Sequence, residues 1–516
     1  MYSTVHSAAL DGMQVEMIRV EADVSNGLPM FHMVGYLSSE VKEAGERVRA
    51  AIRNTGICLL PKKMIVNLSP AAVRKRGASF DLPIAVAVLA AYEVICVEDL
   101  KDVLFVGELG LNGELLKVSG ILPTVIEARH KGYRVCVVPG GNEREGSVIQ
   151  GIQIVGAKTL AEVLDYIRDP DTFQRKRKET RDKVVSITKF GKGTSEEVVD
   201  FQDVSGQEML KRAAEIAVAG QHNLLMIGTP GASKTMIAQR IPTILPPLEL
   251  EESIEISKVY SILGLLDTEH PLIVDRPFRK VHHTATRTAL AGGGLHPAPG
   301  EISLAHGGVL MLDELAEFPK SVLEVLRQPM EEQEIQIVRS RGTYYFPADF
   351  LLISAMNPCP CGYYPDRSRC TCTEAEVNRY LGKISQPLLS RIDLCVEAPR
   401  VEYGNLKQTG RGESSAKIRA RVCHVREIQR QRYKGLKVHV NGRLSAREVE
   451  KYCVLDAEGE AMMQIAYDRL GLTARTYHKV LKVARTIADL SEAEVIRAEH
   501  LAEALGLRMP DQKYWG

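Results

Sequence analysis

The chain lacks the features that mark membrane or secreted proteins. Its 516 residues contain no apolar run of membrane-spanning length, and Met1 to His6 do not follow a signal-peptide pattern. Positive and negative charges almost cancel, with 66 Lys and Arg against 65 Asp and Glu, so the overall charge indicates no partner. We find no internal repeat and no interleaved aromatics that would stack bases. These absences predict no membrane association and restrict any basic surface to a local patch.

Ten cysteines are present, and six of them are scattered along the chain. These six lie in apolar or helical contexts: Cys58, Cys96, Cys136, Cys395, Cys423 and Cys453. Such usage is typical of a reducing compartment rather than of a disulfide framework, so we expect a cytoplasmic protein. A chain of this length also has material for more than one domain.

Changes of pattern along the chain predict four segments. Residues 1–168 alternate short strands and helices, and 169–198 form a basic linker with eight Lys and Arg between 175 and 192. Residues 199–400 contain buried strands with polar residues at their ends, and 401–516 are helical in pattern. For the linker, a solvated connection is the first interpretation and a nucleic-acid contact is the second.

The most informative stretch is a glycine-rich loop that follows the apolar run 224–227. Its residues are Gly228, Thr229, Pro230, Gly231, Ala232, Ser233, Lys234 and Thr235. A strand, a tight turn and a helix that begins with Lys-Thr predict a phosphate-binding loop. Backbone N–H groups surround the anion, Lys234 adds positive charge, and Thr235 offers Mg²⁺ a hydroxyl. Ser233 replaces the usual glycine before the lysine, so the loop taken alone could be an ordinary turn.

Two further apolar strands end in polar side chains that suit the same ligand. Residues 309–312 precede Asp313 and Glu314, and residues 351–356 precede Asn357. We expect Asp313 to hold the Mg²⁺ of bound ATP, and Glu314 to orient and deprotonate the attacking water. Because parallel strands bring their carboxyl ends to one edge of a sheet, the three strands predict an ATP-hydrolysing P-loop domain.

The remaining four cysteines form two close pairs, Cys359 with Cys361 and Cys370 with Cys372. Four thiolates joined by a short polar loop can surround one tetrahedral Zn²⁺. Two disulfides in an oxidising compartment, or four free thiols, are the alternatives. For a cytoplasmic protein we prefer one structural zinc.

A second basic stretch lies between residues 411 and 443. It carries ten Lys and Arg against two Glu, partly on a helix whose opposite face is apolar. Clustered cations release counterions when they meet phosphates, so this stretch and residues 175–192 are the candidate DNA contacts. A solvated helix face is the alternative.

Long stretches of the chain resemble the YifB/ComM family of magnesium-chelatase-like AAA+ ATPases. The matching residues are 75–85, 282–285, 299–306, 355–362 and 484–490. The resemblance implies a homo-oligomer, a hexamer, that uses ATP to act on single-stranded or branched DNA. ComM members resemble the branch-migration helicases that extend recombination in natural transformation. In AAA+ ATPases, a polar residue at the position of Asn357 senses the γ-phosphate.

The resemblance also implies roles for two arginines. Arg391 matches the arginine finger that reaches the γ-phosphate of a neighbouring subunit, and Arg475 matches the sensor-2 arginine that ties the helical lid to the nucleotide. A guanidinium suits both roles because its fixed fork neutralises charge spread over phosphate oxygens. Ser390 stands where the family more often has Asp, and a surface salt bridge is the alternative for each arginine. Residues 292–300 match a pore loop or a plain connector.

Residues 1–168 resemble the Lon-type proteolytic domain, a ribosomal-S5-like α/β fold. Ser79 lies near the position of the Lon nucleophile, but the segment expected to supply the lysine base, residues 120–124, contains no lysine. A hydroxyl without a base is a poor nucleophile, so we expect this domain not to be a protease. The expected fold is therefore an α/β multidomain protein: this N-terminal domain, an AAA+ P-loop core with a parallel sheet, and a helical C-terminal lid.

Two other functions stay open beside the preferred one, an ATP-hydrolysing DNA motor. A chelatase-type motor would use the same core to remodel a partner protein during metal insertion into a tetrapyrrole. The N-terminal block disfavours this function, because chelatase motor subunits lack such a block. The second alternative is a DNA- or nucleotide-binding protein that has lost ATP hydrolysis, since a side chain at Ser233 could tilt the phosphate loop.

Overall fold

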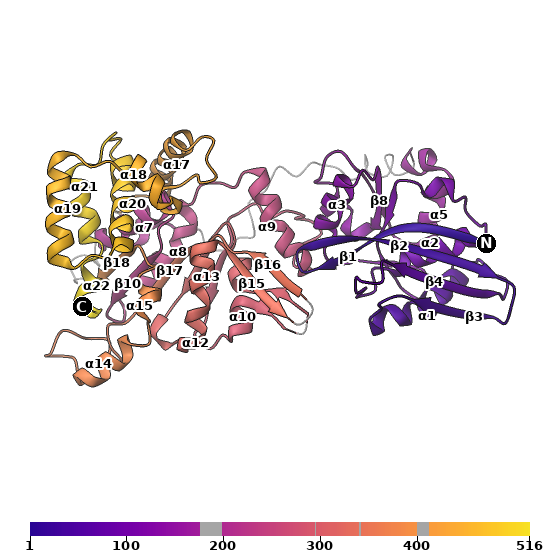
Figure 1. Cartoon of the computed structure of the whole chain (residues 1–516), viewed down its shortest axis with the longest axis horizontal. Helices are drawn as coiled ribbons and strands as arrows, with labels where there is room; N and C mark the ends of the chain where they lie inside the picture. Colours follow the sequence, from indigo (N-terminus) through magenta and orange to yellow (C-terminus); the bar gives the residue numbers. More distant parts are fainter. Residues whose placement is uncertain (176–198, 295, 340–341, 400–411, 516) are drawn as a thin grey trace. The chain divides into compact units, whose positions relative to one another are not determined.

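The computed structural model describes residues 1–175, 199–294, 296–339, 342–399 and 412–515. They form two compact units (Figure 1). The N-terminal unit consists of Met1–Lys192 and Leu250–Ile273, and the C-terminal unit consists of Gly193–Glu249 and Val274–Gly516. Among the residues that the structure describes, no helix combines the length and the apolar character needed to cross a bilayer. Most of the basic 175–192 segment lies outside the described residues.

The N-terminal unit is built on a mixed seven-stranded sheet with the order β3-β4-β2-β1-β5-β8-β9. Its strands are β1 (Tyr2–Asp11), β2 (Gln14–Ser25), β3 (Met30–Val34), β4 (Lys63–Ser69), β5 (Val103–Phe105), β8 (Val135–Pro139) and β9 (Gln153–Ala157). Strands β1 and β2 pair antiparallel, while β5, β8 and β9 run parallel. Alternate residues along the second half of β2 are buried, as its alternating sequence predicts.

Helices complete the core of this unit. The longer ones are α1 (Ser39–Asn54), α2 (Asp81–Ala91), α3 (Ile121–His130) and α5 (Leu160–Arg168). Every residue of α2 is buried, which accounts for its almost wholly apolar sequence. This helix packs against β1, β2 and α1. Its one charged residue, Asp81, is paired with Arg47 at 2.7 Å, so the buried carboxylate does not lack a partner.

The stretch Leu250–Ile273 belongs to the N-terminal unit although its flanking residues belong to the C-terminal unit. It contains α9 (Leu250–Ile262), which packs against α3. The hydroxyl of Ser261 donates to the Glu145 carboxylate at 2.5 Å and accepts from the backbone N–H of Leu122 at 3.3 Å. The chain therefore crosses between the units inside the segment 199–400, a division that the sequence pattern does not indicate.

The C-terminal unit contains a five-stranded parallel sheet with the order β11-β14-β17-β10-β18. Its strands are β10 (Leu224–Gly228), β11 (Phe278–Val281), β14 (Val309–Leu312), β17 (Leu351–Met356) and β18 (Leu394–Ala398). Residues of β10, β14 and β17 are all buried, which explains their continuous apolar runs. The expectation of a parallel sheet is thus confirmed.

Two small antiparallel hairpins and a set of short helices lie between these strands along the chain. The hairpins are β12 (Gly292–Gly293) with β13 (Ala298–Pro299), and β15 (Glu334–Arg339) with β16 (Gly342–Pro347). The helices are α10 (Arg287–Ala291), α11 (Glu301–Leu304), α12 (Lys320–Leu323), α13 (Arg327–Glu332), α14 (Glu374–Leu381) and α15 (Gln386–Leu389).

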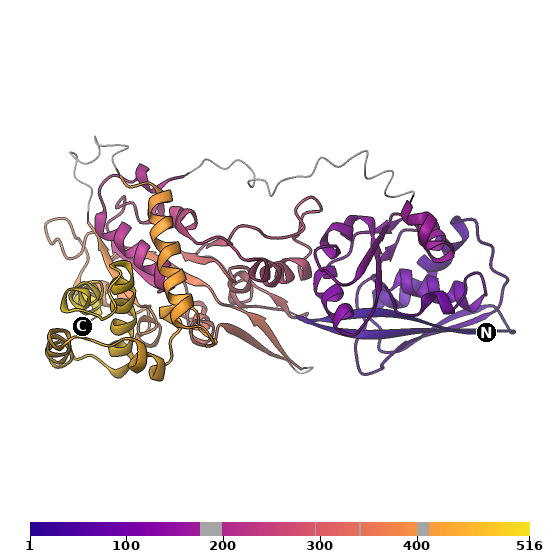
Figure 2. The ribbon, with the colours of Figure 1, turned by 90° about the horizontal axis from the view of Figure 1, so that it is seen from above.

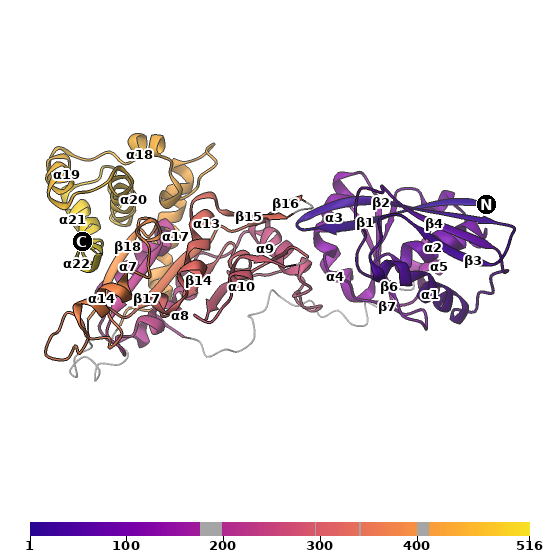
Figure 3. The ribbon, with the colours of Figure 1, turned by 60° about the horizontal axis from the view of Figure 1, so that its bottom comes forward.

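Longer helices flank the parallel sheet. The helices α7 (Glu208–Gly220) and α8 (Lys234–Ile244) pack against it, and Figure 2 shows α17 (Ser415–Arg432) running beside both of these helices. The remainder are α18 (Ala446–Tyr452), α19 (Ala457–Leu470), α20 (Ala474–Leu490), α21 (Ala498–Gly506) and α22 (Met509–Trp515). They gather at one end of this unit, with α22 packed on β18 (Figure 3). The helical C-terminus is therefore confirmed.

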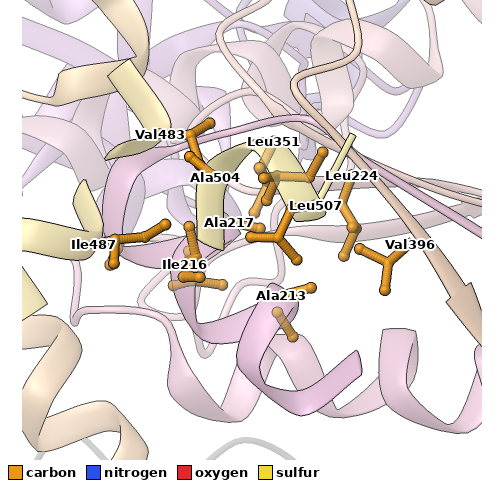
Figure 4. Packing of buried hydrophobic residues seen from close by; sticks show 14 of the residues in the cluster. Ala213, Ile216, Ala217, Leu224, Leu351, Val396, Val483, Ile487, Ala504 and Leu507 are labelled. Carbon is orange, nitrogen blue, oxygen red and sulfur yellow. The ribbon is translucent and has the colours of Figure 1, made fainter. Parts of the chain in front are cut away.

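One buried cluster joins the sheet to these C-terminal helices. Side chains of α7, such as Ile216, lie between Leu224 of β10 and Ile487 of α20 (Figure 4). Leu507, which follows α21, is also part of this cluster and is 1% exposed. Because the sheet and the lid share one core, the helical C-terminus is held firmly against the strands that carry the phosphate loop.

Candidate nucleotide-binding site

The phosphate loop lies between β10, which ends at Gly228, and α8, which begins at Lys234. The expected strand–turn–helix geometry is therefore present, and the backbone N–H groups at the start of α8 are free of helical partners. Ser233 directly precedes the helix with φ of 60°, in the left-handed region. That conformation costs an L-residue roughly 1–2 kcal/mol, which explains why glycine is common at this position.

Lys234 is buried at the carboxyl edge of the sheet, with 9% of its surface exposed. Its Nζ donates to the carbonyl oxygens of Gly228 at 2.6 Å and Thr229 at 3.0 Å, and to Oδ1 of Asn357 at 3.2 Å. Burial lowers the pKa of Lys234 to about 8, against the opposing effect of the Asp313 carboxylate. A buried ammonium held only by neutral oxygens is well placed to gain an anionic ligand.

Thr235 and Asp313 meet from neighbouring elements of the same edge. The Thr235 hydroxyl donates to Oδ2 of Asp313 at 3.0 Å. A hydroxyl and a carboxylate oxygen side by side are hard donors of the kind that Mg²⁺ prefers, and both can stay in its shell beside phosphate oxygens and water. The buried hydroxyl of Thr229 has no hydrogen-bond partner among the described residues. The residues present therefore fit a phosphate with its magnesium.

Two residues of this site have no assigned role in the sequence pattern. Both come from β11 or the turn after it, the strand next to β14. Lys280 Nζ lies 3.4 Å from Asp313, and His283 Nδ1 lies 3.2 Å from the Glu314 carboxylate. Lys280 adds positive charge where a metal–phosphate group would bind, and His283 contacts the carboxylate of Glu314. Their strand is too short and too mixed in sequence to have identified them, although residues 282–285 match the family.

Arg391 and Arg475 lie together, but at the opposite edge of the sheet from Lys234. Arg391 Nη2 contacts Glu331 at 2.8 Å and Arg475 Nη2 contacts the same carboxylate at 3.2 Å. The backbone of Arg391 accepts a bond from Asn223, the residue before β10, at 3.3 Å. Within one chain, therefore, neither arginine is joined to the phosphate loop, and the structure does not place Arg475 on the nucleotide site of its own subunit.

These two arginines line a cavity of about 360 Å³ at the amino edge of the sheet. Its further basic lining residues are Arg443, His478, Lys479 and Lys482. Lys479 pairs with Asp393 at 2.7 Å, and burial lowers the pKa of Lys479 to about 8 although Asp393 opposes this. The cavity is thus positively charged overall, with Glu331 as the carboxylate that both arginines share.

The paired cysteines come together, as their spacing predicts. The four Sγ atoms of Cys359, Cys361, Cys370 and Cys372 lie within 4.8 Å of one another. The Sγ of Cys359 is 3.3 Å from that of Cys361 and 3.8 Å from that of Cys370. Sulfurs bound tetrahedrally to Zn²⁺ at about 2.3 Å are about 3.8 Å apart, so the cluster has the size of a zinc site.

The pKa values of the cluster thiols are shifted in opposite directions. Desolvation raises the pKa of Cys361, but hydrogen bonds from the backbone of Tyr363, from Cys359 and from other neighbours outweigh this and lower it to about 6, while the pKa values of Cys370 and Cys372 are raised. All four cysteines are free thiols, and the chain enters the cluster directly after β17 and Asn357.

The basic helix α17 is largely neutralised by partners within the chain. Arg421 contacts Glu215 at 2.6 Å, Arg430 contacts Glu249 at 2.7 Å, and Arg432 pairs with Asp489. Ion pairs of this kind hold α17 against the core and reduce the charge available for phosphates. Arg411, at the start of this basic stretch, lies outside the described residues.

Among the described residues, no basic side chain is hydrogen-bonded to the Ser79 hydroxyl. At the start of α3, the segment expected to supply the lysine, Leu122 is fully buried. Lys75 is the nearest lysine in the sequence, and its Nζ donates to the carbonyl oxygen of Pro70. Burial lowers the pKa of Lys75, but its hydrogen bond directs the amine to the backbone.

Comparison with known proteins agrees with this site. The family profiles described as "Magnesium chelatase, subunit ChlI", "Subunit ChlI of Mg-chelatase" and "Magnesium chelatase, subunit ChlI C-terminal" match residues 200–406, 20–142 and 412–508. Competence protein ComM of Haemophilus influenzae is 41% identical over 505 residues, which cover 98% of this chain and 97% of that protein.

Two other relatives extend the comparison. The uncharacterized protein YifB of Salmonella typhimurium is 42% identical over 509 residues, which cover 98% of this chain and 97% of that protein. Lon protease 2 of Bacillus subtilis is 28% identical over 139 residues, only 27% of this chain and 25% of that protease. The parallel sheet, its phosphate loop and these matches define a magnesium-chelatase-like protein of the AAA+ class. Within that class, the chain belongs to the YifB/ComM family.

Proposed function

We propose that the protein is an ATP-hydrolysing AAA+ motor that acts on DNA. The observation that supports ATP hydrolysis is a pair of hydrogen bonds at one edge of the sheet. Thr235 is bonded to Asp313, and Lys234 is bonded to Asn357. Residues from three strands meet there, in the arrangement that a triphosphate and its metal require. The relationship to competence protein ComM supports the choice of DNA as substrate.

In this proposal the chain's own residues divide the work of hydrolysis. Lys234 binds the phosphates, and it must exchange its bonds to the loop carbonyls for bonds to the ligand. Thr235 and Asp313 would hold Mg²⁺, which would supply positive charge beside the phosphates. Glu314, oriented by His283, positions and deprotonates the attacking water. Asn357 connects the γ-phosphate position to β17.

We further propose that the active form is an oligomer, a hexamer, in which Arg391 and Arg475 serve a neighbouring subunit. Their position at the amino edge of the sheet, away from Lys234, supports action across an interface. An interface of this kind joins different surfaces of two copies, and repeated copies then close into a ring. Glu331 holds both guanidinium groups in place until a neighbour's phosphates compete for them.

Contact with single-stranded or branched DNA is proposed for the two hairpins. The β12–β13 hairpin lies against the β15–β16 hairpin. This closeness shows at Gly293, where an added Cβ would be 2.9 Å from Nη2 of Arg339. Val338 and Tyr345 are 64% and 46% exposed on the second hairpin. This exposed surface and residues 292–300 are better candidates than α17, where three arginines are paired with carboxylates of the chain.

The decisive experiment measures ATP turnover by the purified full chain alone, with single-stranded DNA and with forked DNA, beside Lys234→Ala as the inactive control. We expect Mg²⁺-dependent hydrolysis that DNA stimulates. Stimulation by a partner protein and not by DNA would favour the chelatase-type motor. Tight nucleotide binding without turnover would favour a protein with decayed hydrolysis, for which the strained Ser233 is the motivating observation.

We also propose one structural Zn²⁺ at the four cysteines. The sulfur separations, which spread around the value for a tetrahedral site, support this assignment. Elemental analysis of protein purified without chelator should give about one zinc per subunit. Purified protein that contains no metal, and whose melting temperature does not change when Zn²⁺ is added, would contradict it.

A further inference from the structure

The cysteine segment touches the phosphate loop at a glycine. The site of Gly362 is so close to Pro230 that a Cβ added there would lie 2.5 Å from Cδ and 2.8 Å from Cγ of the proline. Gly362 also has φ of +84° and is buried. Only a residue without a side chain permits this approach, so the backbone of the cysteine segment supports the turn of the phosphate loop directly.

The cysteines define the position of Gly362. It follows Cys361 directly, and its N–H donates to the carbonyl oxygen of Cys359 at 3.0 Å. The next turn is tied to the same cysteine, because the backbone N–H of Tyr364 donates to Sγ of Cys359 at 3.4 Å. Residues 365–369, between the two cysteine pairs, are exposed and contribute no core. A metal shared by the four thiolates would therefore be the main constraint on this segment.

The same stretch of chain holds the loop at a second point. Asn357, which precedes the cysteines, accepts a hydrogen bond from Lys234 at 3.2 Å. The phosphate loop is thus held at Pro230 by Gly362 and at Lys234 by Asn357. Rigid support of a backbone that must approach an anion reduces the conformational entropy lost when the anion binds.

We propose that the metal-bound cysteine segment, residues 359–372, is a support for the phosphate loop, so that metal occupancy sets nucleotide affinity and Gly362 is a positioning residue. The proposal rests on the proposed function to the extent that the loop binds a nucleoside triphosphate. It predicts that loss of the metal weakens nucleotide binding. A side chain added at Gly362, which would push Pro230 away, should weaken binding in the same way, although neither change replaces a residue of the phosphate loop.

The first test is Gly362→Ala, with binding of a fluorescent ATP analogue as the readout. Gly435→Ala is the matched control, because Gly435 has φ of +88° and nothing within 4 Å of its added Cβ. Both substitutions introduce the same backbone strain, and only the first meets Pro230. We expect at least about tenfold weaker binding for Gly362→Ala and less than about twofold change for Gly435→Ala.

The second test keeps the native sequence and removes the metal. Zinc is extracted with a chelator, the chelator is dialysed away, and nucleotide affinity is measured before and after Zn²⁺ is restored. We expect weak binding without zinc and recovery with it, and the same loss in Cys372→Ser without recovery. Equal affinity in the two states, or equal effects of the two glycine variants, would overturn the support role. A native protein that binds no nucleotide in any state would instead refute the proposed function.

Discussion

The hydroxyl of Thr235 lies 3.0 Å from the Asp313 carboxylate, although the two residues belong to separate elements of the chain. The contact exists because β10 and β14 both end at the carboxyl edge of one parallel sheet, on either side of β17. At this edge Lys234, with an ammonium buried among carbonyl oxygens, completes a site that favours an anion bearing a divalent cation.

The affinity for nucleotide should fall as the pH rises above about 8. The pKa of Lys234 in the free protein is lowered to about 8 by burial, so the ammonium is charged below that pH and loses its proton above it. A bound triphosphate favours the charged form, so binding above this pH requires proton uptake and weakens by up to about tenfold per pH unit. Lys234→Arg, which stays charged, should show no such dependence in calorimetry between about pH 7 and about pH 9. An identical pH profile for both proteins would refute the assignment.

Replacing Glu314 should separate binding from hydrolysis. Glu314→Gln removes the base but keeps the size of the side chain, so we expect unchanged ATP affinity and turnover lower by about 10²–10⁴-fold. His283→Ala should lower turnover less, because His283 orients Glu314 at 3.2 Å and does not itself take the proton. In His283→Ala/Glu314→Gln the histidine substitution should have no additional effect. Additive losses in the double variant would place His283 in a separate role.

Ser233→Gly should relieve strain in the phosphate loop. Removing the left-handed strain of Ser233 gains roughly 1–2 kcal/mol, while the greater freedom of glycine costs about 0.5–1 kcal/mol. We therefore expect nucleotide affinity and turnover to rise by at most about tenfold and not to fall. Measured ATP turnover that appears only in Ser233→Gly would show instead that hydrolysis has decayed in the native chain.

Arg391 and Arg475 should act on the neighbouring subunit. Arg391→Ala alone should lower turnover by about 10³-fold or more, and Lys234→Ala alone should be inactive. When the two variants are mixed and reassembled, some interfaces combine an intact phosphate loop with an intact Arg391. Random mixing should then restore up to about a quarter of the native turnover, measured per subunit. A mixture as inactive as its parts would contradict action across the interface.

The sequence alone predicts much of the parallel sheet and most of the phosphate site. Runs such as 224–227 and 351–356 are apolar without interruption, because strands buried on both faces leave no solvent-facing position. Polar residues directly after such runs must lie at the carboxyl edge, so Asp313 and Asn357 follow from their place in the chain. The short spacing of Cys359 and Cys361 likewise brings their thiols together with little help from the rest of the fold.

Contacts between distant parts of the chain could not be predicted in this way. His283 and Lys280 reach the site because β11 pairs with β14, and pairing partners are not encoded in local pattern. Arg475 and Arg391 meet at Glu331 because the lid folds onto the amino edge of the sheet, a contact that neither the local pattern nor the resemblance indicated.

The sequence by itself determined which residues could bind a phosphate, because phosphate binding depends on residue type and on short spacing along the chain. Only the tertiary structure decided which edge of the sheet each arginine serves, that Leu250–Ile273 folds in the N-terminal unit, and that Gly362 approaches Pro230. These features depend on the packing of segments far apart in the chain, where the free energy comes from complementary surfaces that no single segment contains.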